Sequence, residues 1–122
     1  MKNALVEVGG QPVIVKEPGT LENLNQLILP GVGAFSDAIN LLKKKNFIAA
    51  LNDYAGRGKK ILGICLGMQL MCNSSNENGK HTGFGWFDAS VEKIHSSSGI
   101  KVPHIGWNSV EIVNDNNLFH NI

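Results

Sequence analysis

Short apolar runs alternate along the chain with segments that have helical spacing. Three runs rich in β-branched or aliphatic residues predict strands, at residues 12–16 (PVIVK), 27–29 (LIL) and 61–64 (ILGI). The second run suits a parallel strand covered on both faces, because it contains no polar residue. Two later segments, residues 86–94 and 108–113, predict further strands.

Between these runs, apolar residues recur at spacings of three and four, which predicts helices. Residues 2–8 predict the end of a helix, which stops at Gly9-Gly10. Ser36 is a candidate cap for a helix with its apolar side formed by Ala38, Ile39, Leu41 and Leu42. Asn46 is a candidate cap for a second helix, ended by Gly56 and Gly58, whose apolar residues are Phe47, Ile48, Leu51 and Tyr54.

Residues 66–72 predict a third helix, and the polar residues 73–82, which include Asn78-Gly79, predict a loop or hairpin turn. Strands that alternate with helices predict an α/β fold of three layers, with a mostly parallel sheet flanked by helices. The 122 residues suffice for one domain, residues 1–122, and not for two. Because the pattern begins inside a helix with no strand before it, we expect this domain to be partial.

Composition excludes several classes of function. Eleven basic residues balance ten acidic residues, so the net charge of +1 gives no basis for binding nucleic acid or a membrane. The N-terminus lacks the apolar core of a signal peptide, and the expected location is the cytoplasm. The two cysteines, Cys65 and Cys72, match no common zinc spacing, so we expect two thiols and no metal.

The strongest chemical signal is the segment KILGICLGMQL, residues 60–70. It places Cys65 between Gly63 and Gly67, at the junction of a strand and a helix. This is the cysteine form of a nucleophile elbow, whose tight turn leaves no space for side chains two positions on either side. The turn also directs the amide of Leu66 toward a developing oxyanion. The alternative is that Cys65 is a buried apolar residue. For Cys72 we favour a role without chemistry, as a residue of the core or of the surface.

A second glycine-rich segment, LILPGVGAF at residues 27–35, follows the same strand-to-loop pattern. Glycine lets the backbone approach a ligand closely, so an amide of this loop is a candidate second oxyanion donor. Taken alone the motif is weak, because many strands end in a Pro-Gly turn.

Together with PHIGWN at residues 103–108, these two motifs resemble class I glutamine amidotransferases of flavodoxin-like fold. Among them, the combination is most similar to glutaminase subunits of imidazole glycerol phosphate synthase. The resemblance implies that Cys65 attacks the side-chain carbonyl of glutamine, with the amides of Val32 and Leu66 holding the oxyanion. It also implies a glutamine pocket formed by Gly31, Gly33, Gln69 and Glu77. The alternatives are a solvated helix residue for Gln69, for which we favour the binding role, and a loop carboxylate for Glu77.

The resemblance further implies a heterodimer and no cofactor. In the family, ammonia passes to a synthase subunit with a (β/α)₈ barrel, which makes imidazole glycerol phosphate in histidine biosynthesis. The residues that face this partner in the family correspond to His104, Trp107 and Asn108. The alternative for Trp107 is a strand residue packed in the core.

One part of the family pattern is absent from these residues. The family uses a histidine and a glutamate in a His-x-Glu arrangement, and none of the four histidines here has a glutamate two residues later. We therefore expect the fragment itself to be inactive. Three alternatives remain open, namely a paralogous subunit that supplies ammonia for surface-sugar modification, an inactive binding module, and an unrelated cysteine hydrolase.

Overall fold

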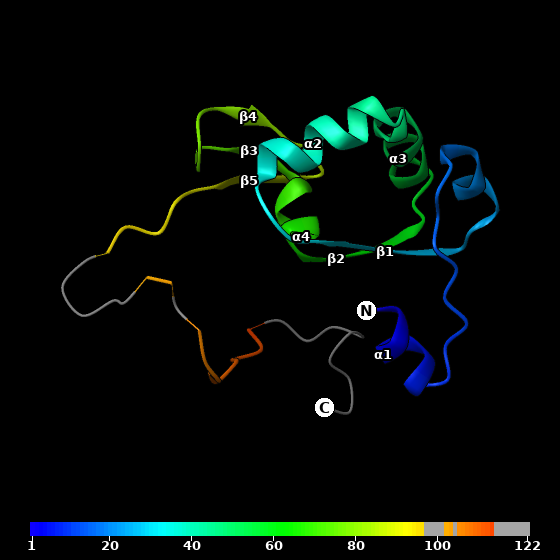
Figure 1. The fold of residues 1–122 in the computed structure, drawn as a ribbon, viewed down its shortest axis with the longest axis horizontal. Helices are drawn as coiled ribbons and strands as arrows, with labels where there is room; N and C mark the ends of the chain where they lie inside the picture. The colour runs from blue at the N-terminus through cyan, green and yellow to red at the C-terminus, as the bar shows by residue number, and fades with distance from the viewer. Residues whose placement is uncertain (97–101, 104, 114–122) are drawn as a thin grey trace.

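The computed structural model describes residues 1–96, 102–103 and 105–113 of the chain. Its elements alternate between helix and strand up to residue 70 and are mostly strands afterwards (Figure 1). In chain order they are α1 (Lys2–Glu7), the 3₁₀ helix η1 (Pro18–Asn23), β1 (Gln26–Gly31), α2 (Phe35–Lys44), α3 (Phe47–Gly56), β2 (Lys60–Cys65), α4 (Leu66–Leu70), β3 (Cys72–Ser75), β4 (His81–Thr82) and β5 (Phe87–Val91).

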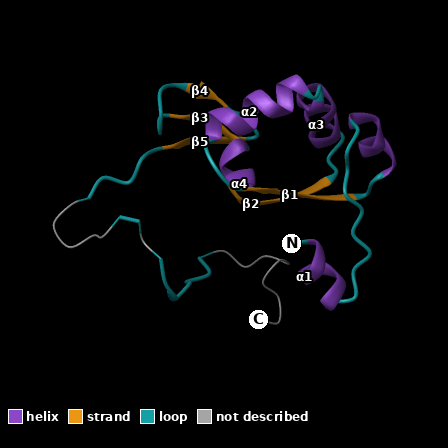
Figure 2. Ribbon diagram, viewed as in Figure 1, coloured by secondary structure: helices purple, strands orange, loops and turns teal. Residues whose placement is uncertain are grey.

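The strands form two small sheets instead of one (Figure 2). β1 and β2 pair in parallel from Gln26↔Lys60 to Gly31↔Cys65. In the second sheet β3 pairs with β5 in parallel and with the short β4 in antiparallel orientation. The α/β class with mostly parallel pairing is thus confirmed, and the arrangement is consistent with an incomplete flavodoxin-like fold.

Helices α2, α3 and α4 lie on one side of the β1–β2 pair, and α1 lies on the other (Figure 1). The core is on the three-helix side, because the apolar residues of these helices face the strands. It consists of two clusters, one formed by Leu21, Phe47, Leu51 and Tyr54 and the other by Phe35, Ile39, Leu66 and Leu70. No residue of α1 is buried.

The loop that leads into β5 joins the second sheet to this core. The rings of Phe84 and Trp86 stack with centroids 4.4 Å apart. The indole Nε1 of Trp86 donates a hydrogen bond to Oδ1 of Asn52, over 2.9 Å. The second sheet is therefore fixed against α3, and the hairpin that follows α4 is held in place.

Two of the predicted strands are wrong. Residues 12–16 and 108–113 adopt no strand, although their composition favours one. A strand requires a hydrogen-bonding partner as well as suitable side chains, and neither segment pairs with another strand within the described part of the chain. Val13 and Ile14 are accordingly 70% and 63% exposed.

Several local predictions also need correction. The cap of α2 is Ala34, because Ser36 already lies inside the helix. Asn46 does precede α3, but its side chain makes no capping hydrogen bond, and its backbone is left-handed with φ of 59°. The predicted helix of residues 66–72 ends at Leu70, and Cys72 begins β3. The hairpin predicted over residues 73–82 is confirmed by the pairing of β3 with β4.

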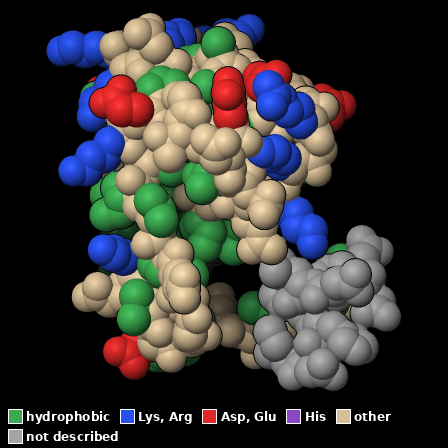
Figure 3. Space-filling view, turned by 90° about the vertical axis from the view of Figure 1, so that its right-hand side faces the viewer, with side chains coloured by type: hydrophobic (Ala, Val, Ile, Leu, Met, Phe, Trp, Pro, Cys, Tyr) green, Lys and Arg blue, Asp and Glu red, His purple; other side chains and the backbone are tan. Residues whose placement is uncertain are grey.

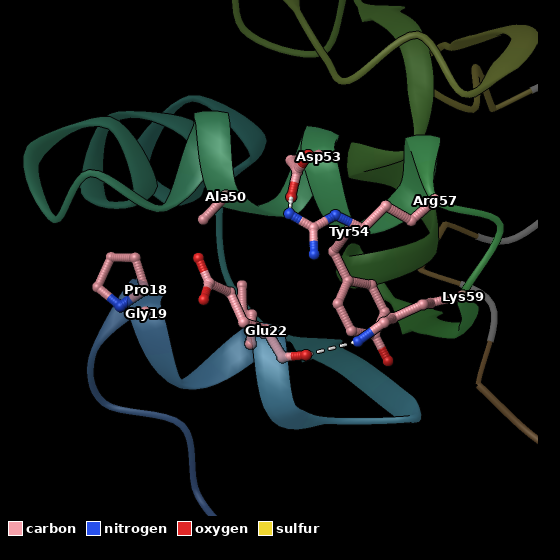
Figure 4. A pocket seen from close by; sticks show the side chains of 9 residues that line it. Pro18, Gly19, Glu22, Ala50, Asp53, Tyr54, Arg57 and Lys59 are labelled. Carbon is pink, nitrogen blue, oxygen red and sulfur yellow. Dashed lines mark hydrogen bonds and ion pairs between the residues drawn. The ribbon is translucent and has the colours of Figure 1, made fainter.

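A small cavity of about 90 Å³ lies between η1 and α3 (Figure 4). Tyr54 lines it and is only 2% exposed. The Nζ atom of Lys59 lies 5.1 Å from the centre of the Tyr54 ring and donates hydrogen bonds to the carbonyl oxygens of Glu22 and Leu24. The Tyr54 hydroxyl itself is buried and has no hydrogen-bond partner among the residues that the structure describes. Burial raises the pKa of this phenol above its usual value.

Tyr54→Phe will leave the free energy of unfolding unchanged or raise it by up to about 1 kcal/mol. An unpaired buried hydroxyl costs about 1–3 kcal/mol of desolvation, and phenylalanine retains the ring that packs in the core. Denaturant-induced unfolding of the two proteins measures the difference. Tyr54→Ala is the control, and we expect it to lose about 3–5 kcal/mol because it empties the site. A Phe variant that loses more than about 1 kcal/mol would show that the hydroxyl is hydrogen-bonded.

Candidate functional site

Cys65 stands at a sharp bend between a strand and a helix. It is the last residue of β2 and immediately precedes Leu66, the first residue of α4. Its φ of 54° and ψ of −121° lie in a region that residues with a side chain rarely adopt. The cysteine is exposed, so the fold does not bury it as an apolar core residue. The bend predicted from the sequence is therefore present, and it presents Cys65 to solvent.

Contact distances explain why the residues two positions before and after Cys65 are glycines. A Cβ atom on Gly63 would lie 2.6 Å from the Cα atom of Met68. A Cβ atom on Gly67 would collide with the carbonyl oxygen of Leu29 in β1. These contacts confirm the prediction that the turn is too tight for side chains at the two positions.

The proline-glycine loop lies directly beside the bend. Gly31 is the parallel partner of Cys65, and a Cβ atom on it would be 2.9 Å from Cβ of Leu66 and 3.1 Å from the amide nitrogen of Gly67. Val32 follows with 92% of its surface exposed, and Gly33 has a φ of 99°. The parallel pairing of β1 and β2 thus brings the two glycine-rich motifs together at one end of the sheet, as open α/β folds do at their sites.

The first amides of α4 have no partner inside the helix, because the first turn of any helix lacks acceptors for its N–H groups. Leu66 is the first of these residues, and its side chain is 2% exposed. This geometry is compatible with the predicted oxyanion site, in which Leu66 and Val32 provide the donors. The roles of both amides remain predictions.

The two side chains predicted to bind glutamine lie on different elements. Gln69 is half-buried on α4, one turn beyond Cys65. Glu77 is half-buried in the connection between β3 and β4. Its amide donates a hydrogen bond of 3.3 Å to Oγ of Ser75. Their roles in binding are predictions that rest on the resemblance.

Ser75 is a residue of this region that the sequence analysis missed. It is completely buried, with an exposed fraction of 0%, and its hydroxyl fixes the backbone at Glu77. A local signal for this contact exists in the sequence. A serine hydroxyl often accepts a hydrogen bond from the backbone amide two residues further along the chain, which here is the amide of Glu77. Ser75 therefore positions the Glu77 backbone from inside the second sheet.

Two of the three predicted partner-facing residues, Trp107 and Asn108, are in the described part of the chain. Trp107 is fully exposed, with a relative accessibility of 104%. It lies in an extended segment, residues 105–113, that runs separately from the helices and strands in Figure 1. Of the two interpretations of Trp107, the structure supports the exposed residue and not the core residue. Asn108 is in the same segment, and His104 lies outside the described residues.

The described residues also include Cys72 and two of the four histidines, His81 and His95. Cys72 is 6% exposed and therefore belongs to the core, which is one of the two placements left open by the sequence. Nε2 of His81 lies 2.9 Å from the carbonyl oxygen of Asn78. Within the described ranges, no three His, Cys, Asp or Glu residues are grouped so that they could hold a metal ion. No helix among the described residues is long and apolar enough to cross a membrane.

Comparison with known proteins identifies the family. Residues 4–98 match the model of the CobB/CobQ-like glutamine amidotransferase domain. The chain is 44% identical over 111 residues to the imidazole glycerol phosphate synthase subunit HisH of Sulfurimonas denitrificans, covering 88% of this chain and 54% of that protein. It is 42% identical over 121 residues to the subunit HisH 2 of Vibrio vulnificus, covering 98% of this chain and 56% of that protein.

A third relative is the chloroplastic imidazole glycerol phosphate synthase hisHF of Arabidopsis thaliana. The chain is 39% identical to it over 122 residues, and the match covers 100% of this chain and 21% of that protein. The chain spans about half the length of the HisH relatives. The family match covers residues 4–98 and includes both glycine-rich motifs. The chain therefore belongs to the CobB/CobQ-like family of glutamine amidotransferase domains.

Proposed function

We propose that this chain is part of a glutaminase subunit that releases ammonia from glutamine for imidazole glycerol phosphate synthase. The observation that carries the proposal is the exposed Cys65 at a positive-φ bend, paired in register with Gly31 of the neighbouring loop. The proposed unit is one partial amidotransferase domain, residues 1–122. The HisH and hisHF relatives support the choice of synthase, because they match 88–100% of this chain at 39–44% identity.

In the proposed reaction, the sulfur of Cys65 adds to the side-chain carbonyl carbon of glutamine. The carbonyl oxygen becomes an oxyanion, which the amides of Leu66 and Val32 stabilise. The carbon–nitrogen bond then breaks, the nitrogen takes up a proton, and ammonia leaves behind a glutamyl thioester. Water hydrolyses the thioester to glutamate and regenerates the thiol. Gln69 and Glu77 would orient the substrate.

The proposed ammonia acceptor is a synthase subunit with a (β/α)₈ barrel, which would form a heterodimer with this subunit in the cytoplasm. The full exposure of Trp107 supports a role in that interface, since buried tryptophans often anchor protein–protein contacts. His104 and Asn108 would belong to the same surface. The complete synthase reaction would combine glutamine hydrolysis with a lyase step on the partner.

The general base is the missing component of this proposal. None of the four histidines within these 122 residues has a glutamate two residues later. A positioned base contributes about 10²–10⁴-fold to a reaction of this kind. We therefore propose that this chain alone forms the covalent adduct with glutamine analogues but turns over glutamine slowly or not at all.

Covalent labelling tests this function without requiring turnover. Incubation with diazo-oxo-norleucine, an electrophile that resembles glutamine, will attach one label at Cys65, located by mass spectrometry of peptides. L-Glutamine in excess will slow the labelling because it competes for the same pocket, whereas D-glutamine will not. Cys65→Ala will abolish the adduct, and Cys72→Ala will preserve it.

Each of the other hypotheses predicts a different result. A binding module that has lost its chemistry predicts no label on Cys65, although iodoacetamide still modifies the exposed thiol. An unrelated cysteine hydrolase predicts cleavage of simple esters and no protection by L-glutamine. Either result would overturn the proposed glutaminase site.

A further inference from the structure

The turn between β3 and β4 carries the dipeptide Asn78-Gly79. Both residues are exposed, and Gly79 has a left-handed φ of 96°. Of the asparagines in the sequence, only Asn78 is followed by a glycine. The hairpin lies to the left of the helices in Figure 1, away from the face shown in Figure 3, where charged side chains but no histidine are visible.

An asparagine that precedes a glycine can react with its own backbone. The backbone nitrogen of the second residue attacks the side-chain carbonyl carbon of the asparagine and closes a five-membered ring. A Cβ atom on the second residue shields that nitrogen, and glycine has none. At Gly79 the surroundings are also open. Among the described residues outside its chain neighbours, a Cβ atom there would have one heavy atom within 4 Å, Nε2 of His81 at 3.6 Å.

The ring of His81 contacts the peptide group that would react. Its Nε2 atom lies 2.9 Å from the carbonyl oxygen of Asn78. A carbonyl oxygen can only accept, so Nε2 carries a hydrogen and donates it. This carbonyl belongs to the same peptide group as the nitrogen of Gly79. A hydrogen bond to its oxygen stabilises the anion that forms when the N–H of Gly79 loses its proton. The contact therefore favours the nucleophilic form of that nitrogen.

The hairpin holds this contact in place and leaves the reacting side chain free. His81 of β4 is the partner of Ser75 in β3, and Ser75 is completely buried and accepts the amide of Glu77 on Oγ. Both sides of the turn are thus anchored. Within the described part of the chain, the side-chain amide of Asn78 makes no hydrogen bond. It can therefore approach the nitrogen of Gly79 without breaking a contact.

We propose that Asn78 is a site of self-modification, at which the folded chain converts asparagine to aspartate and isoaspartate with the help of His81. The N–H of Gly79 gives its proton to water, and the nitrogen forms a bond to Cγ of Asn78. The bond between Cγ and Nδ2 breaks, and Nδ2 takes up a proton and leaves as ammonia. Water then opens the ring at either of its two carbonyl carbons.

Both products alter the turn permanently. Each replaces a neutral amide by a carboxylate, so the formal net charge of the chain falls from +1 by one, to zero. In isoaspartate the backbone also runs through Cγ and is one carbon longer. This extra carbon lies between Glu77 and Gly79, which form an isolated bridge in the structure, so the bridge would be lost. The inference is independent of the proposed glutaminase chemistry at Cys65.

Ageing of the whole chain tests the modification. The protein is kept folded in neutral buffer at physiological temperature, and samples taken over days are digested under mildly acidic conditions. Peptide mass spectrometry will show aspartate and isoaspartate accumulating at position 78, and an isoaspartyl methyltransferase will methylate the isoaspartate. Asn73 is the internal control and will stay intact, because its Nδ2 donates a hydrogen bond of 2.8 Å to Oδ1 of Asp88.

Asn78→Gln is the matched variant for the chemistry. Glutamine keeps a neutral amide at the tip of the turn, but its longer side chain cannot close the five-membered ring with Gly79. We expect the reaction at position 78 to be at least about tenfold slower, since it depends on the placement of the two reacting atoms. An aged chain that keeps Asn78 intact, or that modifies Asn73 at the same rate, would overturn the proposal.

Substitution of His81 tests its part in the reaction. His81→Phe keeps a ring but removes the donor, and will slow the modification by about 2–10-fold, the scale of one net hydrogen bond. His81→Gln retains an N–H donor and will recover part of the rate. His95→Phe is the control outside the hairpin and will leave the rate unchanged. In concentrated urea the parent and His81→Phe will react equally fast. An unchanged or faster reaction in folded His81→Phe would refute the role of His81.

Discussion

In the folded chain, iodoacetamide will alkylate Cys65 about 10²-fold faster than Cys72. Cys65 is exposed at the bend that ends β2, so the reagent reaches its sulfur without any change in structure. Cys72 is 6% exposed within β3, so its reaction must wait for a local opening. Openings of folded segments cost from near zero up to the global stability, and an opening of about 3 kcal/mol gives the factor of about 10². Quenched time points analysed by peptide mass spectrometry measure both rates.

Variants that retain one cysteine separate the alkylation of Cys65 from that of Cys72. Cys65→Ala will lose the fast phase, and Cys72→Ala will retain it. In concentrated denaturant the two rates will converge, because both thiols are then exposed. If Cys65 instead reacts as slowly as Cys72 in the native buffer, its thiol is covered, and the elbow geometry would then be wrong.

The elements that could be predicted from the sequence are those whose signals are local. The run at residues 61–64 becomes β2, and the helical spacing of Phe47, Leu51 and Tyr54 becomes the buried side of α3. The elbow belongs to the same class only in part. The contact that excludes a side chain at Gly63 is made by Met68 in the same turn, whereas the contact at Gly67 is made by Leu29 of β1, which is distant in sequence.

The elements that could not be predicted depend on partners distant in sequence. Residues 12–16 have the composition of a strand, but pairing decides whether a strand forms, and composition does not specify a partner. The division of the described strands into two sheets depends on pairing between distant segments, which no single segment encodes. Exposure of Trp107 was left open for the same reason, since a tryptophan suits a core and an interface equally well.

The residues of the candidate site also divide into those that the sequence predicts and those that depend on distant contacts. Cys65, Gly31 and Leu66 come together because the parallel register of β1 and β2 aligns the two motifs, and a parallel sheet was predicted. The buried Ser75 was missed because its burial arises from the second sheet.

Gly67→Ala will lower the free energy of unfolding by about 3 kcal/mol or more. Gly67 lies on α4 where that helix crosses β1, and the added methyl group would collide with the carbonyl oxygen of Leu29. The neighbouring atom is backbone and cannot move aside as a flexible side chain could, so relief requires displacing α4 from the strand. Overpacking of a filled core usually costs about 1–3 kcal/mol, and a backbone collision places this site at or above the upper end. Urea-induced unfolding measures the loss.

Gly56→Ala is the matched control, because Gly56 is also a helical glycine and a Cβ atom there would meet nothing within 4 Å. Alanine reduces the conformational freedom of the unfolded chain, so we expect this variant to be unchanged or more stable by about 0.5–1 kcal/mol. Displacement of α4 in Gly67→Ala would also alter the bend at Cys65, and the alkylation rate of that thiol will change in this variant only. If both variants were equally stable, α4 would not pack on β1 as described, and the elbow would lose the contact that holds its helix in place.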